Sequence, residues 1–371
     1  MTFSFGFSGD DIDADESELI DVQEHNSSVD NDEPLPELME AKRHGIGEWL
    51  PTLPSQISYS RVCVAPSRSE DGRGITLARR EIFDIRTQLM AEDSAGQDSN
   101  EELIAGLEEG DIKPNFYEGG FKTWECALDL ARLVASEDVF GDSPEDRHII
   151  ELGAGTAAPS LALFAQLLLS TRSEPSKARS RAHFTFADYN SSVLRLVTLP
   201  NLLLTWNDIV SGQGTPGEMA LDAAEQDEEL DITPELVENF EKDLSERGIT
   251  VDFISGAWSP AFVDLAFSAV GDGKARTVIL ASETIYSPAS LGAFSETLLA
   301  LLRWSTSAKA KSRAFIAAKK VYFGVGGGVD EFLAVLKDTS GDCDVKEKLD
   351  VKSEGVGRVV LEVTEHGSGR D

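Results

Sequence analysis

The sequence predicts an α/β protein built on a mostly parallel, doubly wound sheet. Three observations lead to this prediction. Between about residues 115 and 364, short β-rich apolar runs alternate with helical patterns, which is typical of strands joined by crossover helices. The last two β-rich runs have no helix between them, which indicates an antiparallel hairpin at one edge of the sheet. A turn with two glycines joins the first strand to its helix, where such folds bind a cofactor.

Each element is predicted from its own pattern of residues. The first helix, 121–136, carries apolar residues at helical spacing, among them Trp124 and Ala127. A β-rich run predicts the first strand at 148–152, and an apolar series predicts the helix at 157–169 that follows it. The same reasoning predicts further strands at 183–187, 250–254, 277–281, 314–321, 344–351 and 358–363. It predicts further helices at 191–206, with an interruption at Pro200, at 291–304 and at 329–336.

Composition divides the chain into three parts. Residues 1–45 hold thirteen acidic residues, and the first Lys or Arg is Lys42, so this tail is predicted to be disordered. Residues 46–114 are predicted to form a weakly ordered extension, and residues 115–371 a folded domain. Two inserts interrupt the domain in its connections: a basic, serine-rich insert at 171–181 and an acidic insert at 211–247, whose second half is helical.

The composition argues against several classes of protein. No apolar run approaches the roughly 20 residues of a membrane span, and the acidic N-terminus is unlike a secretory signal. The three cysteines are far apart, so we expect reduced thiols, no metal site and a location in the cytoplasm or nucleus. A formal charge of −33 argues against direct binding to nucleic acid and favours a basic protein partner, although solubility alone would explain it equally well. We expect a monomer.

The stretch RHIIELGAGTAAPSL, from Arg147 to Leu161, predicts a cofactor site. Its strand ends on Glu151, and Gly153 and Gly155 allow a ligand to approach the backbone before the helix begins. A carboxylate here would repel the pyrophosphate of a nicotinamide cofactor, whereas S-adenosylmethionine carries a sulfonium and no phosphate. The acid therefore favours S-adenosylmethionine. Two alternatives remain open: the run also fits the dinucleotide pattern G-x-G-x-x-A, and it fits a tight turn that binds no ligand.

Other strand ends supply further candidates, because a ligand of an open α/β sheet binds beyond the carboxyl ends of the strands. Asp188 is predicted to accept the two ribose hydroxyls of an adenosine, or alternatively to cap the following helix. Trp258 is predicted either to cover the adenine or to pack in the core. Trp124 fits a cation–π contact with the sulfonium and, equally well, a buried position on its helix.

Two residues of ASETIYSP are the candidate catalytic residues. Glu283 and Tyr286 are spaced by three, so they can share one face of a turn at the mouth of the site and hydrogen-bond the methyl acceptor. The run KKVYFGVGGGVDEF places four glycines after the fifth strand, where a loop either approaches the substrate or forms a mobile lip.

Six segments, in the same order, resemble the eukaryotic histidine protein methyltransferase family: NFYEGGFKTWEC, ELGAGT, FADYNSSVLRLVTLPN, ISGAWSP, LASETIYSP and AAKKVYFGVGGGVDEF. The resemblance covers about residues 115–364, and the start, MTFSFGF, is also similar to that family. It implies the class I methyltransferase fold, with seven strands and an antiparallel edge hairpin. It also implies S-adenosylmethionine as cofactor and a histidine of a large-subunit ribosomal protein as methyl acceptor.

The resemblance further implies which residues contact the methyl donor. These are Lys122, Thr123, Trp124, Glu125, Cys126, Gly153, Asp188, Tyr189, Asn190, Gly256, Ala257, Trp258 and Ser282. With Glu151 and Gly155 of the glycine turn, they make up the predicted donor site. Two positions depart from the family pattern: Ala157 stands where a third glycine is usual, and Ala257 stands where relatives often carry an acid.

The sequence thus predicts a protein-histidine N-methyltransferase. Glu283 is predicted to accept the N–H of the histidine ring opposite the attacking nitrogen, which fixes the tautomer. A lysine-directed methyltransferase of the same fold and, more distantly, a nicotinamide-dependent oxidoreductase are the alternatives. We expect the free ribosomal protein to be the substrate rather than the assembled ribosome, because rRNA phosphates would repel so acidic an enzyme.

Overall fold

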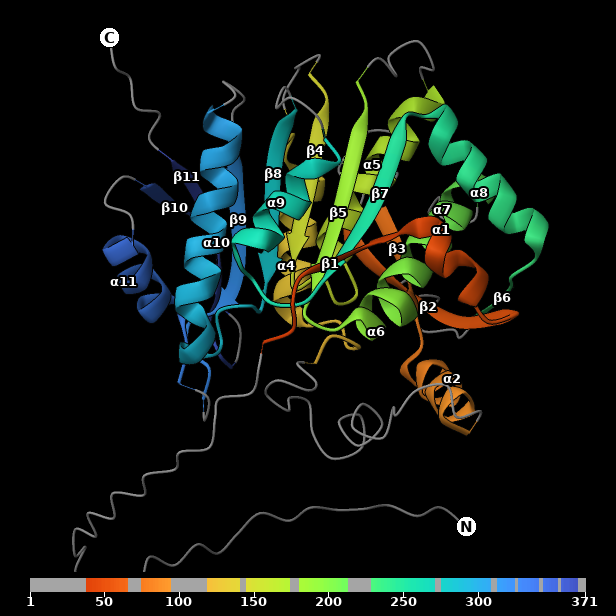
Figure 1. The fold of residues 1–371 in the computed structure, drawn as a ribbon, viewed down its shortest axis with the longest axis horizontal. Helices are drawn as coiled ribbons and strands as arrows, with labels where there is room; N and C mark the ends of the chain where they lie inside the picture. The colour runs from red at the N-terminus through yellow and green to blue at the C-terminus, as the bar shows by residue number, and fades with distance from the viewer. Residues whose placement is uncertain are drawn as a thin grey trace, which may run out of the picture. The chain divides into compact units, whose positions relative to one another are not determined.

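An eight-stranded sheet flanked by helices forms the centre of the structure, which is a computed structural model (Figure 1). The structure describes residues 38–65, 75–94, 119–140, 145–173, 180–212, 228–270, 275–307, 312–323, 326–339, 343–352 and 355–365. Among these residues the strand order is β1-β7-β5-β4-β8-β9-β11-β10. The strands are β1 (Lys42–Gly45), β4 (Arg147–Leu152), β5 (Ala182–Asp188), β7 (Ile249–Ser255), β8 (Arg276–Ser282), β9 (Arg313–Lys319), β10 (Cys343–Val351) and β11 (Arg358–Glu365).

The directions of the strands confirm the predicted fold class. Strands β7, β5, β4, β8 and β9 are parallel neighbours, and β10 and β11 form an antiparallel hairpin that pairs with β9. The seven predicted strands are all present, with ends close to the predicted ones. The eighth strand, β1, pairs antiparallel with β7 at the opposite edge. Its sequence, KRHG, has no apolar pattern, so no strand is predicted there.

The two faces of the sheet bury two hydrophobic cores, because successive side chains of a strand point to opposite faces. Ile149 of β4 belongs to the core that includes helices α4 (Glu125–Ser136), α5 (Ala158–Ser173) and α7 (Leu199–Ser211). Its neighbour Ile150 belongs to the core that includes α9 (Pro260–Ser268), α10 (Pro288–Ser307) and α11 (Val329–Thr339). Strands buried on both faces have nearly continuous apolar sequences, and this is the pattern from which they are predicted.

Three helical segments differ from the predictions. The first helix begins at Glu125 rather than at residue 121, because the residues before it form a turn. Pro200 does not interrupt its helical region: α6 (Ser191–Val193), a π-helical turn (Leu194–Thr198) and α7 follow one another, so the missing N–H of the proline falls in the first turn of α7. Helix α9 is an addition, and the Ser259 hydroxyl caps it by accepting a hydrogen bond from the N–H of Phe262 at 3.2 Å.

Residues 46–94 hold more regular structure than the weakly ordered extension that the sequence predicts. They form α1 (Ile46–Trp49), a 3-10 turn (Leu50–Thr52), β2 (Gln56–Ala65), β3 (Ile75–Arg80) and α2 (Ile82–Ser94). Strand β2 pairs with β3 on one side and with β6 (Glu228–Asp231) on the other, which gives a three-stranded sheet within the described residues.

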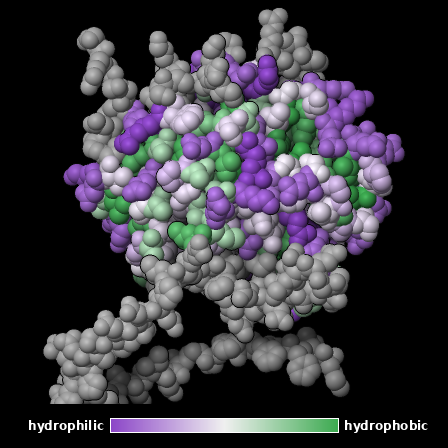
Figure 2. Space-filling model, viewed as in Figure 1, coloured by the Kyte–Doolittle hydropathy of each residue, from purple (hydrophilic) through white to green (hydrophobic). Residues whose placement is uncertain are grey.

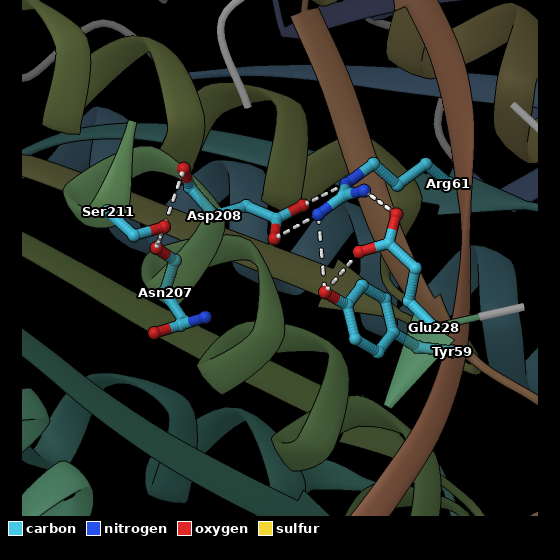
Figure 3. Close-up of polar contacts among 6 residues, drawn as sticks. All are labelled: Tyr59, Arg61, Asn207, Asp208, Ser211 and Glu228. Carbon is cyan, nitrogen blue, oxygen red and sulfur yellow. Dashed lines mark hydrogen bonds and ion pairs between the residues drawn. The ribbon is translucent and has the colours of Figure 1, made fainter. Parts of the chain in front are cut away.

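A buried ion network explains why the sequence pattern of β2 is hard to recognise (Figure 3). Arg61 of β2 donates two hydrogen bonds to the carboxylate of Asp208 on α7, at 2.8 and 3.0 Å, and another to Glu228 of β6. The hydroxyl of Tyr59 donates to Glu228 at 3.0 Å. Only 7% of Arg61 is exposed. A charged residue at a buried position breaks the expected alternation, and its buried charge is tolerated because it is paired.

Several predicted segments lie outside the residues that the structure describes. These are residues 1–37 of the acidic tail, residues 95–118, residues 174–179 of the basic insert and residues 213–227 of the acidic insert. The second half of the acidic insert is helical as predicted: α8 (Pro234–Glu246) begins after Thr233, whose hydroxyl accepts from the N–H of Leu236 at 3.2 Å. Within the described ranges, none of the helices combines the length and apolar character that crossing a membrane requires.

Candidate functional site

A cavity opens at the carboxyl ends of β4, β5 and β8, where the sequence predicts the ligand. Its empty space, which includes open solvent at the mouth, is about 770 Å³. The residues that line it are Gly119, Gly120, Lys122, Trp124, Ala127, Gly153, Ala154, Gly155, Thr156, Asp188, Tyr189, Asn190, Val193, Trp258, Ser282, Glu283, Thr284 and Tyr286.

The turn after β4 brings bare backbone to this cavity. Gly153 and Gly155 both line it in the left-handed region, with φ of +63° and +50°. A methyl group on Gly153 would stand 2.7 Å from the Cγ2 atom of Thr284, so the packing beside the turn leaves no room for a side chain. Ala157, where the family pattern has glycine, also lies in the left-handed region, with φ of +58°. An alanine is strained in this conformation, which explains why glycine is usual there.

Asp188 lies at the end of β5 and is tied to the glycine turn. Its Oδ2 accepts the N–H of Gly155 at 3.1 Å, and its Oδ1 accepts the N–H of Asn190 at 3.2 Å. The cap of the following helix α6 is Asn190, whose side-chain oxygen accepts the N–H of Ser192 at 2.9 Å. The structure thus gives the capping contact to Asn190, and Asp188 lines the cavity beside it.

Glu151 does not line the cavity, in contrast to the position predicted for it. The residue is 0% exposed, and its Oε2 accepts the N–H of Ser160 in the first turn of α5 at 2.9 Å. Burial raises the pKa of this carboxyl group to about 8, so it is mostly protonated at neutral pH. The charge argument by which Glu151 would select the cofactor therefore does not describe this structure. The strand ends at the right place, but the side chain points into the protein.

The segment before α4 contributes two residues to the cavity. Lys122 and Trp124 line it, while Thr123, Glu125 and Cys126 of the same predicted set do not. The indole N–H of Trp124 donates to the carbonyl oxygen of Gly119 at 2.9 Å. The ammonium of Lys319 lies 5.3 Å from the centre of the indole ring, so a cation–π contact already exists at this residue within the protein.

The turn after β7 brings only Trp258 to the cavity, and Gly256 and Ala257 lie beneath another segment. A methyl group on Gly256 would stand 2.5 Å from the carbonyl oxygen of Glu40. The N–H of Ala257 donates to the carbonyl oxygen of Met39 at 2.9 Å. Trp258 also packs edge-on against Phe294 at 5.1 Å between ring centres. Trp258 therefore lines the cavity and packs against a core residue, and its contact with an adenine stays a prediction.

Glu283 and Tyr286 both line the cavity, as predicted for the catalytic candidates. Glu283 has a left-handed backbone, with φ of +57°, and its carboxylate accepts a hydrogen bond from the Tyr322 hydroxyl at 2.6 Å. The rings of Tyr286 and Tyr322 meet at 6.3 Å. Of the four glycines in the following loop, Gly324 lies outside the described residues, and Gly327 packs against the backbone of Tyr286, where a methyl group would stand 2.1 Å from the carbonyl oxygen.

The cavity brings together most of the predicted residues and adds others. Predicted and lining are Lys122, Trp124, Gly153, Gly155, Asp188, Tyr189, Asn190, Trp258, Ser282, Glu283 and Tyr286. Lining but not predicted are Gly119, Gly120, Ala127, Ala154, Thr156, Val193 and Thr284. Gly119 and Gly120, directly before the predicted helix, are the two of these residues that the sequence could have indicated, because adjacent glycines often mark close packing of the backbone. A methyl group on Gly120 would stand 2.8 Å from Val193. No feature of the sequence indicates that the remaining residues line the cavity: Ala127, Ala154, Thr156, Val193 and Thr284.

Relatives of known activity are found by sequence. No protein-family model matches the chain. It is 35% identical over 354 residues to histidine protein methyltransferase 1 of Saccharomyces cerevisiae, with 91% of each chain covered. It is 35% identical over 317 residues to the protein of the same name from Schizosaccharomyces pombe, covering 85% of this chain and 83% of that one. A homologue from Rattus norvegicus is 30% identical over 254 residues, which cover 68% of this chain and 59% of the homologue.

Similarity to solved structures is weaker. The rRNA methyltransferase aviRa from Streptomyces viridochromogenes overlays with a TM-score of 0.34 at 12% identity, covering 72% of this chain and 93% of that one. Magnesium protoporphyrin IX methyltransferase from Synechocystis overlays with a TM-score of 0.33 at 11% identity, covering 76% of this chain and 100% of that one. Scores this low carry no argument, and the fold rests on the strand order described above.

Proposed function

The chain belongs to the histidine protein methyltransferase 1 family, and on this premise we propose that its substrate is a free large-subunit ribosomal protein. Its activity is the transfer of a methyl group from S-adenosylmethionine to a ring nitrogen of a protein histidine. Family membership favours histidine over lysine as the acceptor and sets aside the nicotinamide-dependent oxidoreductase. It leaves the protein substrate open, and the charge of the chain supports our choice.

The cavity fits S-adenosylmethionine, which supplies a methyl group on a positively charged sulfur. Asp188 places a carboxylate at the end of β5, where it would accept the ribose hydroxyls of the adenosine. Gly153 and Gly155 present bare backbone, which allows a ligand to approach closely. Trp258 offers a flat, partly exposed ring that would cover the adenine. These residues would hold the cofactor beside Glu283 and Tyr286.

The acceptor needs positioning more than it needs a strong base. Imidazole has an unperturbed pKa near ~6.5, so at cellular pH one ring nitrogen already carries a free lone pair. Glu283 is assigned to accept the N–H of the other ring nitrogen. This contact fixes the tautomer and stabilises the positive charge that develops on the ring. Tyr286 lines the same cavity and is the second residue assigned to hydrogen-bond the acceptor.

The formal charge of −33 is the observation that supports a free basic protein as substrate. Opposite fields raise association rates roughly ten- to a thousandfold, and ribosomal proteins are basic. In an assembled subunit the rRNA phosphates would repel this chain. The face shown in Figure 2 mixes hydrophilic residues with small groups of hydrophobic ones.

The proposed place of action is the cytoplasm or the nucleus. Cys63, Cys126 and Cys343 are free thiols, as is usual for proteins of reducing compartments. Ribosomal proteins exist there in free form between synthesis and assembly, so enzyme and substrate would meet.

The test compares free and assembled substrates. The purified chain and S-adenosylmethionine are incubated with separated large-subunit proteins or with intact large subunits, and peptide mass spectrometry locates the methyl group. We expect methylhistidine in one free protein and much less in intact subunits. Methyllysine in place of methylhistidine, or no methylation of any ribosomal protein, would contradict the proposal.

A further inference from the structure

Two residues from the end of strand β9 hold the carboxylate of Glu283. Glu283 follows β8 directly, and its backbone N–H donates to the carbonyl oxygen of Ala317 at 2.9 Å. Lys319 is the last residue of β9, and Tyr322 follows three residues later. Because β8 and β9 are parallel neighbours, their carboxyl ends bring these side chains to the same side of the cavity.

The two oxygens of the Glu283 carboxylate have different surroundings. Oε2 accepts the Tyr322 hydroxyl at 2.6 Å, and the hydroxyl oxygen in turn accepts the backbone N–H of Lys319 at 3.2 Å. Oε1 is buried and makes no hydrogen bond with the residues that the structure describes. The ammonium of Lys319 lies 3.7 Å from Oε1. Oε2 is thus held by the Tyr322 hydroxyl, whereas Oε1 is buried without a hydrogen-bond partner among the described residues.

Lys319 is itself fixed from several sides. Its ammonium lies 3.4 Å from a carboxylate oxygen of Glu125 and 5.3 Å from the centre of the Trp124 ring. The side chain is 23% exposed, so it lies largely within the wall of the site rather than in solvent. A cation held in this way restricts where the Glu283 carboxylate can turn.

The backbone of Glu283 also requires such support. Its φ of +57° is a left-handed conformation that costs a residue with a side chain on the order of 1–2 kcal/mol. Residues in this conformation persist where the surrounding structure holds them, and they gather at functional sites. The contacts to Ala317, Tyr322 and Lys319 are the ones that hold this residue.

We propose that Tyr322 and Lys319 are positioning residues for the methyl transfer, which fix the Glu283 carboxylate so that its Oε1 receives the N–H of the acceptor histidine. The proposal rests on the role of Glu283 in the proposed function. Tyr322 occupies Oε2, so the acceptor meets only Oε1. Lys319 keeps the carboxylate in one orientation and does not contact the acceptor.

The protonation states of the groups next to the Glu283 carboxylate are consistent with the proposed positioning. Burial and then the neighbouring Glu283 carboxylate raise the pKa values of the Tyr322 hydroxyl and of the Cys126 thiol. Both groups therefore stay protonated at neutral pH, and the Tyr322 hydroxyl donates its proton to Oε2.

The test uses three variants of the full chain. Tyr322→Phe removes one hydroxyl and keeps the ring against Tyr286, Lys319→Met removes the ammonium, and Lys319→Arg keeps the charge. We expect kcat for histidine methylation to fall about 10- to 100-fold in Tyr322→Phe and in Lys319→Met, because each loses a contact with a charged group. Lys319→Arg should recover most of the rate. KM for the protein and the affinity for S-adenosylhomocysteine should stay close to those of the unmodified chain, because neither residue binds the donor.

Matched controls separate positioning from general loss of stability. Lys320→Met removes the neighbouring lysine, whose ammonium pairs with Asp350 at 2.7 Å. Tyr59→Phe removes a hydroxyl that donates to the carboxylate of Glu228 at 3.0 Å. Both variants lose a contact of the same kind outside the cavity, so we expect a lower melting temperature at most and an unchanged kcat.

Glu283→Gln distinguishes the two ways in which the proposal can fail. If Glu283→Gln lowers kcat while Tyr322→Phe and Lys319→Met do not, Glu283 keeps its role and the positioning proposal is wrong. If Glu283→Gln retains full kcat, the assigned role of Glu283 fails together with the positioning proposal. Equal losses in Lys319→Met and Lys319→Arg, with a matching drop in donor affinity, would reduce Lys319 to a structural residue.

Discussion

The carboxylate of Asp188 accepts a hydrogen bond from the backbone N–H of Gly155 at 3.1 Å, which ties the end of β5 to the glycine turn after β4. The two strands are parallel and in register, so Ala187 lies opposite Leu152, and the residues that follow them meet at the cavity. Because Asn190 caps the next helix, Asp188 can be changed without removing that cap. The role of Asp188 in donor binding is therefore open to a direct test.

Asp188→Ala should weaken donor binding without unfolding the protein. The variant leaves the ribose hydroxyls without their acceptor, a loss of about 1–3 kcal/mol, or roughly 5- to 150-fold in affinity. Titration calorimetry with S-adenosylhomocysteine measures the change, and a melting curve of the same sample shows whether the fold persists. Unchanged affinity would leave Asp188 with the structural role of bridging Gly155 and Asn190.

Gly153→Ala should lower both stability and donor affinity, whereas Gly212→Ala should lower stability alone. Both glycines are left-handed, with φ of +63° and +78°, so alanine is strained at either by roughly 1–2 kcal/mol. A methyl group at Gly153 also meets Thr284 at 2.7 Å, while one at Gly212 has nothing within 4 Å. Comparing melting temperatures and S-adenosylhomocysteine binding separates strain from damage to the cavity. Equal binding by both variants would show that the turn at Gly153 is not part of the donor site.

Gly256→Ala should displace the segment of Leu38 to Ala41 from the turn after β7. The added methyl group would lie 2.5 Å from the carbonyl oxygen of Glu40 and 2.9 Å from the Cα of Ala41. Both are backbone atoms, so a whole segment of the chain has to move to relieve the clash. We expect a destabilisation of about 1–3 kcal/mol, as for other overpacked sites. Gly212→Ala is the matched control, because Gly212 is also left-handed, with φ of +78° against +104° at Gly256, and has nothing within 4 Å. Urea unfolding of both variants measures the difference, and equal stabilities would mean that this segment is not held against Gly256.

The central strands and the place of the site were predictable because each depends on a local or topological rule. Ile149 and Ile150 are both buried, on opposite faces of the sheet. Strands that are buried on both faces have nearly continuous apolar sequences, and this pattern makes them recognisable. The rule that ligands bind at the carboxyl ends of parallel strands then leads to Asp188 and Glu283 without knowledge of any contact. Strand β1 and residue Arg61 of β2 follow no such pattern, since pairing with distant partners decides their structure.

The direction of single side chains could not be predicted. Glu151 lies one residue before the end of β4, yet its carboxylate turns under helix α5 to accept the backbone N–H of Ser160. Gly256 is covered by Glu40, which is distant in sequence. Trp124 faces the ammonium of Lys319 from another strand. Each of these contacts joins segments that are separated along the chain, so a local pattern of residues does not predict it.

Glu151→Gln should change how stability depends on pH. Burial raises the pKa of Glu151 from its usual value of 4.5 to about 8, so between these values the folded chain keeps a proton that the unfolded chain has released. The contribution of Glu151 to stability is therefore complete below about pH 4.5 and is lost as the pH rises towards 8. Glutamine keeps an oxygen that can accept the N–H of Ser160 and does not titrate. The unmodified chain should lose stability relative to the variant as the pH rises.

The measurement is the free energy of urea unfolding of both proteins at pH 5, 6.5 and 8. The buried His148 acts in the opposite direction, since burial lowers its pKa and stability falls as the pH drops below about 6.5. That effect is common to both proteins and cancels in the difference. A difference that stays constant from pH 5 to 8 would show that Glu151 does not keep a proton in the folded chain.

Methylation of a free ribosomal protein should slow as salt rises, while donor binding should not. The charge of −33 attracts a basic substrate over distances that salt screens, with a Debye length of about 10 Å at 0.1 M. We therefore expect kcat/KM for the free protein to fall across a series from about 0.05 to 0.5 M salt, with kcat little changed, because attraction acts on encounter rather than on the chemical step. Binding of S-adenosylhomocysteine over the same series is the control for effects on the cavity itself. Intact large subunits should be poorer substrates than the free protein at low salt, where the repulsion between the rRNA phosphates and the enzyme is least screened. Equal rates on both substrates, independent of ionic strength, would mean that the charge of the chain has no part in choosing the substrate.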